Sequence, residues 1–177
     1  MSRLSYSSTG VALSASAMLV AVSLLMAPAP AHAQALTQRN ISATQALAIV
    51  NGALESCGRN GALVTVTIAV VDRAGQPRLL LAGDTAAPHT LELARRKAYT
   101  ARTFRRPSLE WAARTAGDAP LAGQRELLDV IPLGGGVPIM IGDDAIGGVG
   151  VSGTPGGQTG DEACAMAGVA AIAEQLR

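Results

Sequence analysis

The chain has few aromatic side chains and a single lysine. Its 177 residues include one Phe, one Trp and two Tyr, and all of its 14 basic residues except Lys97 are arginines. So few rings cannot form a series of stacking positions for unpaired bases. A formal net charge of +1 also gives no general attraction to a phosphate backbone. We therefore expect no nucleic-acid partner.

Histidine and cysteine are also scarce, which limits the metal and nucleophile chemistry available. After residue 33 only His89, Cys57 and Cys164 remain, and the two cysteines do not have the spacing of a metal-binding motif. No serine lies in the sequence signature of a hydrolase nucleophile. We predict no metal site and no catalytic residues, and an enzyme is the less favoured class of protein.

The N-terminus has the pattern of a secretory signal peptide. A basic start is followed by the apolar run 17–30 and by the small-residue site Ala-His-Ala at 31–33. An uncleaved membrane anchor is the alternative interpretation. The signal peptide is favoured over it, because the run is short for a bilayer span and contains two prolines. We predict a signal peptide at 1–33, a periplasmic or secreted protein without a membrane span after processing, and one mature domain at 34–177.

Both cysteines remain after the predicted cleavage. Disulfides are the usual state of cysteine pairs in exported proteins. We therefore predict a bridge between Cys57 and Cys164, with two buried free thiols as the alternative.

The pattern of apolar residues indicates a mixed domain. Alternation along 63–72 predicts a strand, and the tight turn after it makes 78–82 its hairpin partner. The stretch 90–104 lacks Gly and Pro and predicts a helix, which Pro107 ends. The other expected elements are a helix from Ser42 to Asn60, a short helix from Ser108, strands at 128–133, 137–141 and 145–153, and a helix at 159–176. This order predicts an α+β fold built on antiparallel hairpins.

Two glycine-rich stretches resemble nucleotide-binding motifs only superficially. Gly148, Gly150 and Gly153 match G-x-G-x-x-G, but they lie inside an expected strand and not at a strand-to-helix turn. The simpler interpretation is a strand thinned so that another backbone or a flat ligand can come close. The loop 153–160 lacks the G-K-[ST] ending of a phosphate loop, so a plain helix entry is favoured.

The stretch 95–104 concentrates the residue types that the rest of the chain lacks. It holds four cations, including Lys97, and two of the aromatic residues. On a helix, Lys97 and Thr100 lie one turn apart on the same face, where they suit an acidic or carboxylate-bearing ligand. The alternative is a solvated cationic face with the alanines packed on the sheet. His89, just before this segment, is either a solvated or capping residue or an axial ligand to haem iron.

Five stretches in this order carry a family likeness: 67-TIAVVDRAGQ-76, 97-KAYTARTF-104, 134-GGGVPI-139, 146-IGGVGVSG-153 and 161-DEACAMAG-168. Together they resemble the GlcG/HbpS-like family of haem-binding domains. The resemblance implies a profilin-like α/β sandwich, with a five-stranded antiparallel sheet flanked by helices, over almost the whole mature chain. It also implies assembly into a homo-oligomer and, in some exported members, haem binding.

Family motifs fall on specific residues of this chain. The resemblance places the K-A-x-T-A motif on Lys97 to Ala101 and the G-G-G-V-P turn on Gly134 to Pro138, and it implies that these approach each other around a pocket. The expected ligand-binding residues are Arg96, Lys97, Thr100, Gly134, Gly135 and Gly136. The candidate axial ligands of haem are His89, Tyr99 and Thr100.

The favoured function is that of an exported haem-binding protein, acting as a carrier or as an accessory in redox or haem sensing. Haem is accordingly the expected cofactor. An enzyme or accessory subunit is the second interpretation, with Lys97 holding or attacking a small carboxylic acid. A structural oligomer without turnover is the third.

Overall fold

The computed structural model describes residues 36–58 and 65–177. The predicted signal peptide and the end of the first expected helix lie outside the described residues. Residues 38–177 form one compact unit. Within the described part of the chain, no helix is long and apolar enough to cross a membrane.

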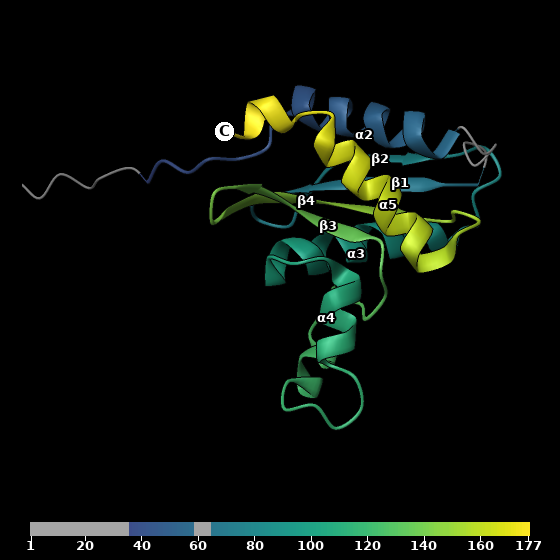
Figure 1. Ribbon diagram of the computed structural model, residues 1–177, viewed down its shortest axis with the longest axis vertical. Helices are drawn as coiled ribbons and strands as arrows, with labels where there is room; N and C mark the ends of the chain where they lie inside the picture. The colour runs from purple at the N-terminus through teal and green to yellow at the C-terminus, as the bar shows by residue number, and fades with distance from the viewer. Residues whose placement is uncertain (1–35, 59–64) are drawn as a thin grey trace, which may run out of the picture. The chain divides into compact units, whose positions relative to one another are not determined.

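The elements of this unit follow one another as a mixture of helices and hairpins (Figure 1). They are α2 (Ala43–Gly58), β1 (Thr67–Asp72), β2 (Pro77–Ala82), α3 (His89–Phe104), α4 (Ser108–Arg114), the 3-10 helix η2 (Ala122–Glu126), β3 (Gly136–Ile141), β4 (Asp144–Ser152), α5 (Gly157–Ala170) and the 3-10 helix η3 (Ala173–Leu176). The α+β class predicted from the sequence is confirmed.

The strands form one antiparallel sheet in the order β2-β1-β4-β3. Two hairpins, β1–β2 and β3–β4, meet through the pairing of β1 with β4, in which Ile68 lies opposite Val151. The described residues thus give four strands where five were expected. The number of strands was therefore wrong, and the profilin-like assignment stays a prediction.

The missing strand is the stretch 128–133, which is a loop. Asp129 has a φ of 67°, a left-handed conformation far from that of a regular strand. Pro132 follows and has no backbone N–H to donate to a neighbouring strand. The polar backbone groups of this loop bond instead to side chains of α3, because Ile131 N donates to Thr100 and Val130 O accepts from Arg96.

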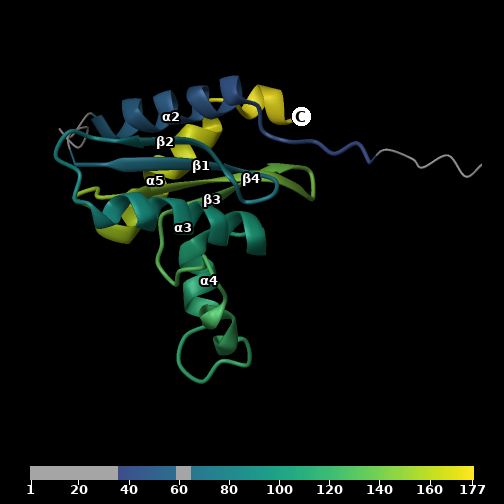
Figure 2. The ribbon, with the colours of Figure 1, turned by 180° about the vertical axis from the view of Figure 1, so that it is seen from behind.

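Helices cover both faces of the sheet (Figures 1 and 2). Helices α2 and α5 lie on one face, where apolar side chains of α2 pack on Ile68 and Val70 of β1. Helix α3 lies on the opposite face. The core on the α2 side is formed by aliphatic residues, among them Ile41, Ile49, Val50, Val66, Ile139, Ile146, Val149, Val151 and Ile172. Burial of these side chains is the main stabilising term of the unit.

Helix α3 lies unusually close to the sheet because β4 has glycines beneath it. A Cβ atom at Gly150 would collide with the backbone of Ala94 and Ala98, and one at Gly148 would collide with the carbonyl of Ala98. The alanines of α3 are fully buried in this contact. The glycine-thinned strand therefore admits another backbone, which is one of the two interpretations given above.

A disulfide joins Cys57 at the end of α2 to Cys164 in α5, with the Cα atoms 5.8 Å apart. This is the predicted bridge. The helices that it joins are those that share one face of the sheet. In the chain-entropy model, closing a loop of this length stabilises the fold by about 4–5 kcal/mol.

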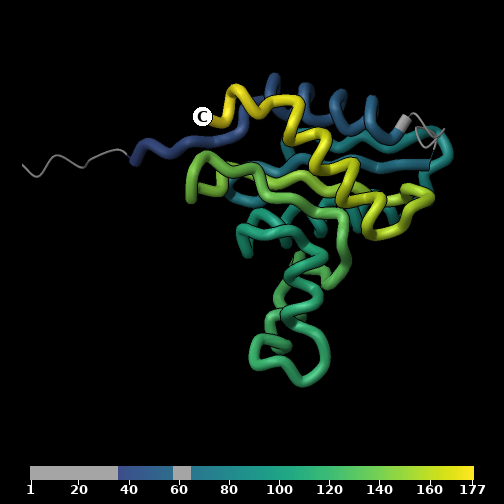
Figure 3. The backbone as a smooth tube through the Cα atoms, in the orientation of Figure 1, coloured from purple at the N-terminus to yellow at the C-terminus, as the bar shows by residue number. Residues whose placement is uncertain are grey.

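The chain between α3 and β3 runs away from the sheet and returns to it (Figure 3). The stacked rings of Phe104 and Trp111, with centroids 4.7 Å apart, hold the base of this excursion. Trp111 Nε1 donates to Gln124 Oε1 at 3.2 Å, and Arg125 donates to the Ala112 carbonyl at 2.6 Å. These contacts hold α4 and η2 against each other.

Candidate functional site

Lys97 points into the protein and not into solvent. Its Nζ donates to Asp161 Oδ2 at 2.7 Å and to the Val151 carbonyl at 3.1 Å. The side chains of Lys97 and Asp161 are only 3% and 5% exposed. The pair therefore forms a buried ion pair that ties α3 to the first turns of α5.

Asp161 holds a second element with its other oxygen. Its Oδ1 accepts hydrogen bonds from the backbone N of Thr154 at 3.0 Å and from the Thr154 hydroxyl at 2.8 Å. The turn that leads into α5 is fixed in this way. Sequence reasoning attributed Asp161 to the helix dipole alone and missed this role. The available signal was that Asp161 begins one of the five family stretches, 161-DEACAMAG-168, and that the only lysine begins another, 97-KAYTARTF-104.

Arg96 and Thr100 hold the loop before β3. Thr100 Oγ1 donates to the Arg96 carbonyl at 2.8 Å and accepts from Ile131 N at 2.9 Å, and its side chain is fully buried. Arg96 donates to the Val130 carbonyl at 2.5 Å and to Glu92 at 3.4 Å. Both residues are thus engaged with the protein itself.

The glycine turn lies against the lysine, as the resemblance implied, but without an open space between them. A Cβ atom at Gly135 would lie 2.6 Å from Asp161 Cβ, and one at Gly136 would collide with the Lys97 carbonyl. At Gly134 it would lie 2.9 Å from Leu109. These three positions are glycine in this structure because a side chain there would collide with the neighbouring groups. A ligand-binding role for them stays a prediction.

The three candidate axial ligands have different environments. His89 is exposed in the first turn of α3 and has no hydrogen-bond partner among the described residues. Tyr99 is half-buried with its ring against Gly75, where a Cβ atom would lie 2.6 Å from Tyr99 Cε2. Thr100 is fully buried, and its hydroxyl already donates to Arg96 and accepts from Ile131. Of the three, His89 is the most exposed.

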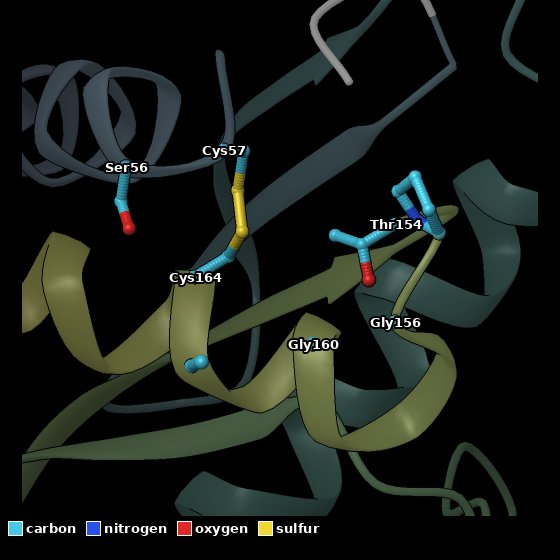
Figure 4. A pocket seen from close by; sticks show the side chains of 8 residues that line it. Ser56, Cys57, Thr154, Gly156, Gly160 and Cys164 are labelled. Carbon is cyan, nitrogen blue, oxygen red and sulfur yellow. A yellow bond between two sulfur atoms is a disulfide. The ribbon is translucent and has the colours of Figure 1, made fainter. Parts of the chain in front are cut away.

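Among the hollows on the surface of the described residues are three that neither His89 nor Lys97 lines. The first has a volume of about 370 Å³ and lies beside the disulfide, between the end of α2 and the start of α5 (Figure 4). The second, of about 410 Å³, is lined by Phe104, Arg105, Arg106, Met140 and Asp143. The third, of about 440 Å³, is lined by Gln38, Asn40, Arg73, Ala74 and Arg102.

Metal-binding groups do not gather in the described part of the chain. No group of three His, Cys, Asp or Glu side chains there has the arrangement needed to hold a metal ion. His89 is the single imidazole of that part.

An α+β sheet domain with a buried lysine–aspartate pair and a glycine turn against it defines the class of this protein. Residues 41–170 match the model of the family described as "Haem degrading protein HbpS-like". The chain belongs to this family.

Solved structures agree with this assignment. HbpS of Streptomyces reticuli, in the form of a double mutant, is 33% identical, with a TM-score of 0.72 over 82% of this chain and 98% of that one. The PduOC:heme complex is 27% identical, with a TM-score of 0.64 over 75% of this chain and 95% of that one. Klebsiella pneumoniae protein ORFY shares the fold at 22% identity, with a TM-score of 0.72 over 80% and 96% of the two chains. No curated protein matches the chain.

Proposed function

We propose that this chain is an exported protein that binds haem at its surface through His89. Family membership supports haem as the ligand, as does a relative of 27% identity that was solved with heme. The observation in this structure that carries the proposal is the exposed, unpartnered imidazole of His89 on a rigid helix. A single protein ligand is enough to hold a haem iron.

The remaining candidates fit haem less well. Lys97 has two acceptors inside the protein, Thr100 is fully buried, and the three glycines are packed against other groups. A haem at that place would have to break the buried ion pair. The exposed His89 needs no such rearrangement. Bound haem would supply a redox-active iron, which suits a carrier or an accessory in redox or haem sensing.

Hemin titration followed by the Soret band tests this function. The wild-type protein should shift the Soret band at equimolar hemin, and His89→Ala should lose the shift. Tyr99→Phe is the matched control, because it removes only a hydroxyl group from another candidate and should keep the shift. A wild-type protein without a Soret shift would contradict haem binding, and a shift retained in His89→Ala would place the haem elsewhere.

Assembly into a homo-oligomer is part of the same proposal. Strand β2 is an edge strand of the sheet and exposes two leucines, Leu80 at 43% and Leu81 at 41%. Exposed apolar edge strands favour pairing with another chain. Size-exclusion chromatography with light scattering should find more than one chain per particle, and a monomer at micromolar concentration would contradict this part.

A further inference from the structure

Arg102 differs from the other cations of its segment because nothing balances it. Arg95 pairs with Asp129 at 2.7 Å, Arg96 with Glu92 and Lys97 with Asp161. Arg102 has no hydrogen-bond or ion-pair partner in the described part of the chain. Its Nε is buried without an acceptor there, as is that of Arg96. Arg96 has other acceptors and Arg102 has none, so the guanidinium of Arg102 is the one left for an acceptor from outside.

The packing of Arg102 directs it toward one of the hollows. Its Cβ lies over β4, because a Cβ atom at Gly148 would be only 3.0 Å away. The stem is therefore fixed on the sheet, and Arg102 lines the hollow of about 440 Å³ together with Arg73 and Ala74 of the β1–β2 turn. Gln38 and Asn40, from the segment before α2, complete the lining.

Two cations line this hollow, Arg73 and Arg102, and only one of them is left without a negative partner. Arg73 is neutralised, because its guanidinium pairs with Asp144 at 2.7 Å and also donates to the Arg39 carbonyl at 3.3 Å. No carboxylate lines the hollow. The charge of Arg102 thus remains for a ligand that carries a single negative charge.

Asn40 adds a directional donor to the hollow. Its Oδ1 already accepts from the backbone N of Ile41 at 2.9 Å and of Arg73 at 3.0 Å. These two bonds fix the orientation of the amide, so its NH₂ group is the part left to meet a ligand. A planar guanidinium and a fixed amide donor together suit a planar group with two acceptor oxygens.

We propose that this hollow binds a small monocarboxylate, with Arg102 holding the carboxylate and the amides of Asn40 and Gln38 holding a second polar group. The single free charge favours a carboxylate over a phosphate dianion, which would need a second free cation. The polar lining favours a short acid with a hydroxyl or carbonyl substituent over a fatty acid. Neither His89 nor Lys97 takes part, so this site is separate from the proposed haem ligand.

Calorimetric titration with lactate, and with inorganic phosphate at equal ionic strength, tests the proposal. Lactate should bind with a dissociation constant in the millimolar range or below, and more tightly than phosphate. Arg102→Gln should weaken lactate binding about tenfold or more, because it removes a charge-assisted hydrogen bond. The matched control is Arg114→Gln, which removes one cation from the exposed face of α4, where Arg114 is 55% exposed and pairs with Glu110. It should leave the affinity unchanged.

A second variant keeps the test valid if Arg102→Gln disturbs the fold. Asn40→Asp retains the oxygen that accepts from Ile41 and Arg73, but it replaces the free amide by a negative charge beside the ligand. It should weaken lactate binding at least as much as Arg102→Gln does. The proposal is overturned if wild-type protein does not bind lactate, if phosphate binds as tightly, or if a folded Arg102 or Asn40 variant keeps the wild-type affinity.

Discussion

Lys97 contributes to this fold through the acceptors that surround its ammonium group. A charge transferred from water into a protein core is costly unless a partner and further hydrogen bonds compensate for it. Here Asp161 and the Val151 carbonyl provide both. Lys97, which the sequence predicted to hold a ligand, thus links α3 to β4 and α5.

Replacing Lys97 should therefore destabilise the protein. Lys97→Met leaves the Asp161 carboxylate buried without its partner, and breaking a buried pair in this way costs about 3–5 kcal/mol. Urea unfolding followed by circular dichroism measures the loss. The double variant Lys97→Met with Asp161→Asn should recover part of it, because the asparagine oxygen can still accept from Thr154.

The control for this prediction is a cation on the surface. Arg114→Met changes the same charge at an exposed position and should alter the free energy of unfolding by no more than about 0.5 kcal/mol. A Lys97→Met protein as stable as wild type would show that the pair is not a structural tie. Lys97 would then be available to a ligand, as first expected from the sequence.

The sequence could predict which residues would be special, but not what they would contact. It singled out Lys97, Thr100 and the glycine turn because their types and order match a family. Their partners are Asp161, Ile131 and the backbone of α3, and these lie far away in the chain. Helical spacing shows which side chains share a face. It does not show whether that face meets a ligand or another part of the protein.

At the scale of elements, the sequence correctly predicted the segments that have regular backbone hydrogen bonds and failed for one segment that lacks them. The helices and the two hairpins were predicted from periodicity and turn residues, and they are present. The stretch 128–133 has the composition of a strand, yet it is a loop. Its backbone groups bond to Arg96 and Thr100, and a contact between a helix side chain and a distant loop leaves no periodic pattern in the sequence.

The disulfide between α2 and α5 should provide a large share of the stability of the α2 face. Reduction with dithiothreitol should lower the free energy of unfolding by up to about 4–5 kcal/mol, because the bond closes a loop of more than a hundred residues. The effect is measured by urea unfolding with and without the reductant. No other cysteine exists in the chain, so the double variant Cys57→Ser, Cys164→Ser should not respond to the reductant. Two free thiols by non-reducing mass spectrometry of the wild type would contradict the bridge.

At the scale of the whole molecule, the open question is where the protein works. We predict that the mature chain begins at Gln34 and is found in the periplasm or the medium, since the pattern before it is that of a signal peptide. N-terminal sequencing of the protein from the cell envelope and the medium tests this. An intact Met1 recovered in the membrane fraction would show an uncleaved anchor instead.

The position of the disulfide in the chain has a consequence for how the protein withstands proteases. The bond joins Cys57 to Cys164, and all four described strands lie between these two residues. The excursion between α3 and β3, with exposed residues at 116–118, is where a protease would first cut. A molecule nicked there keeps both fragments linked by the bridge. It should run as one band on a denaturing gel without reductant and as two bands with it, so a cut that would divide an unbridged chain leaves this one whole.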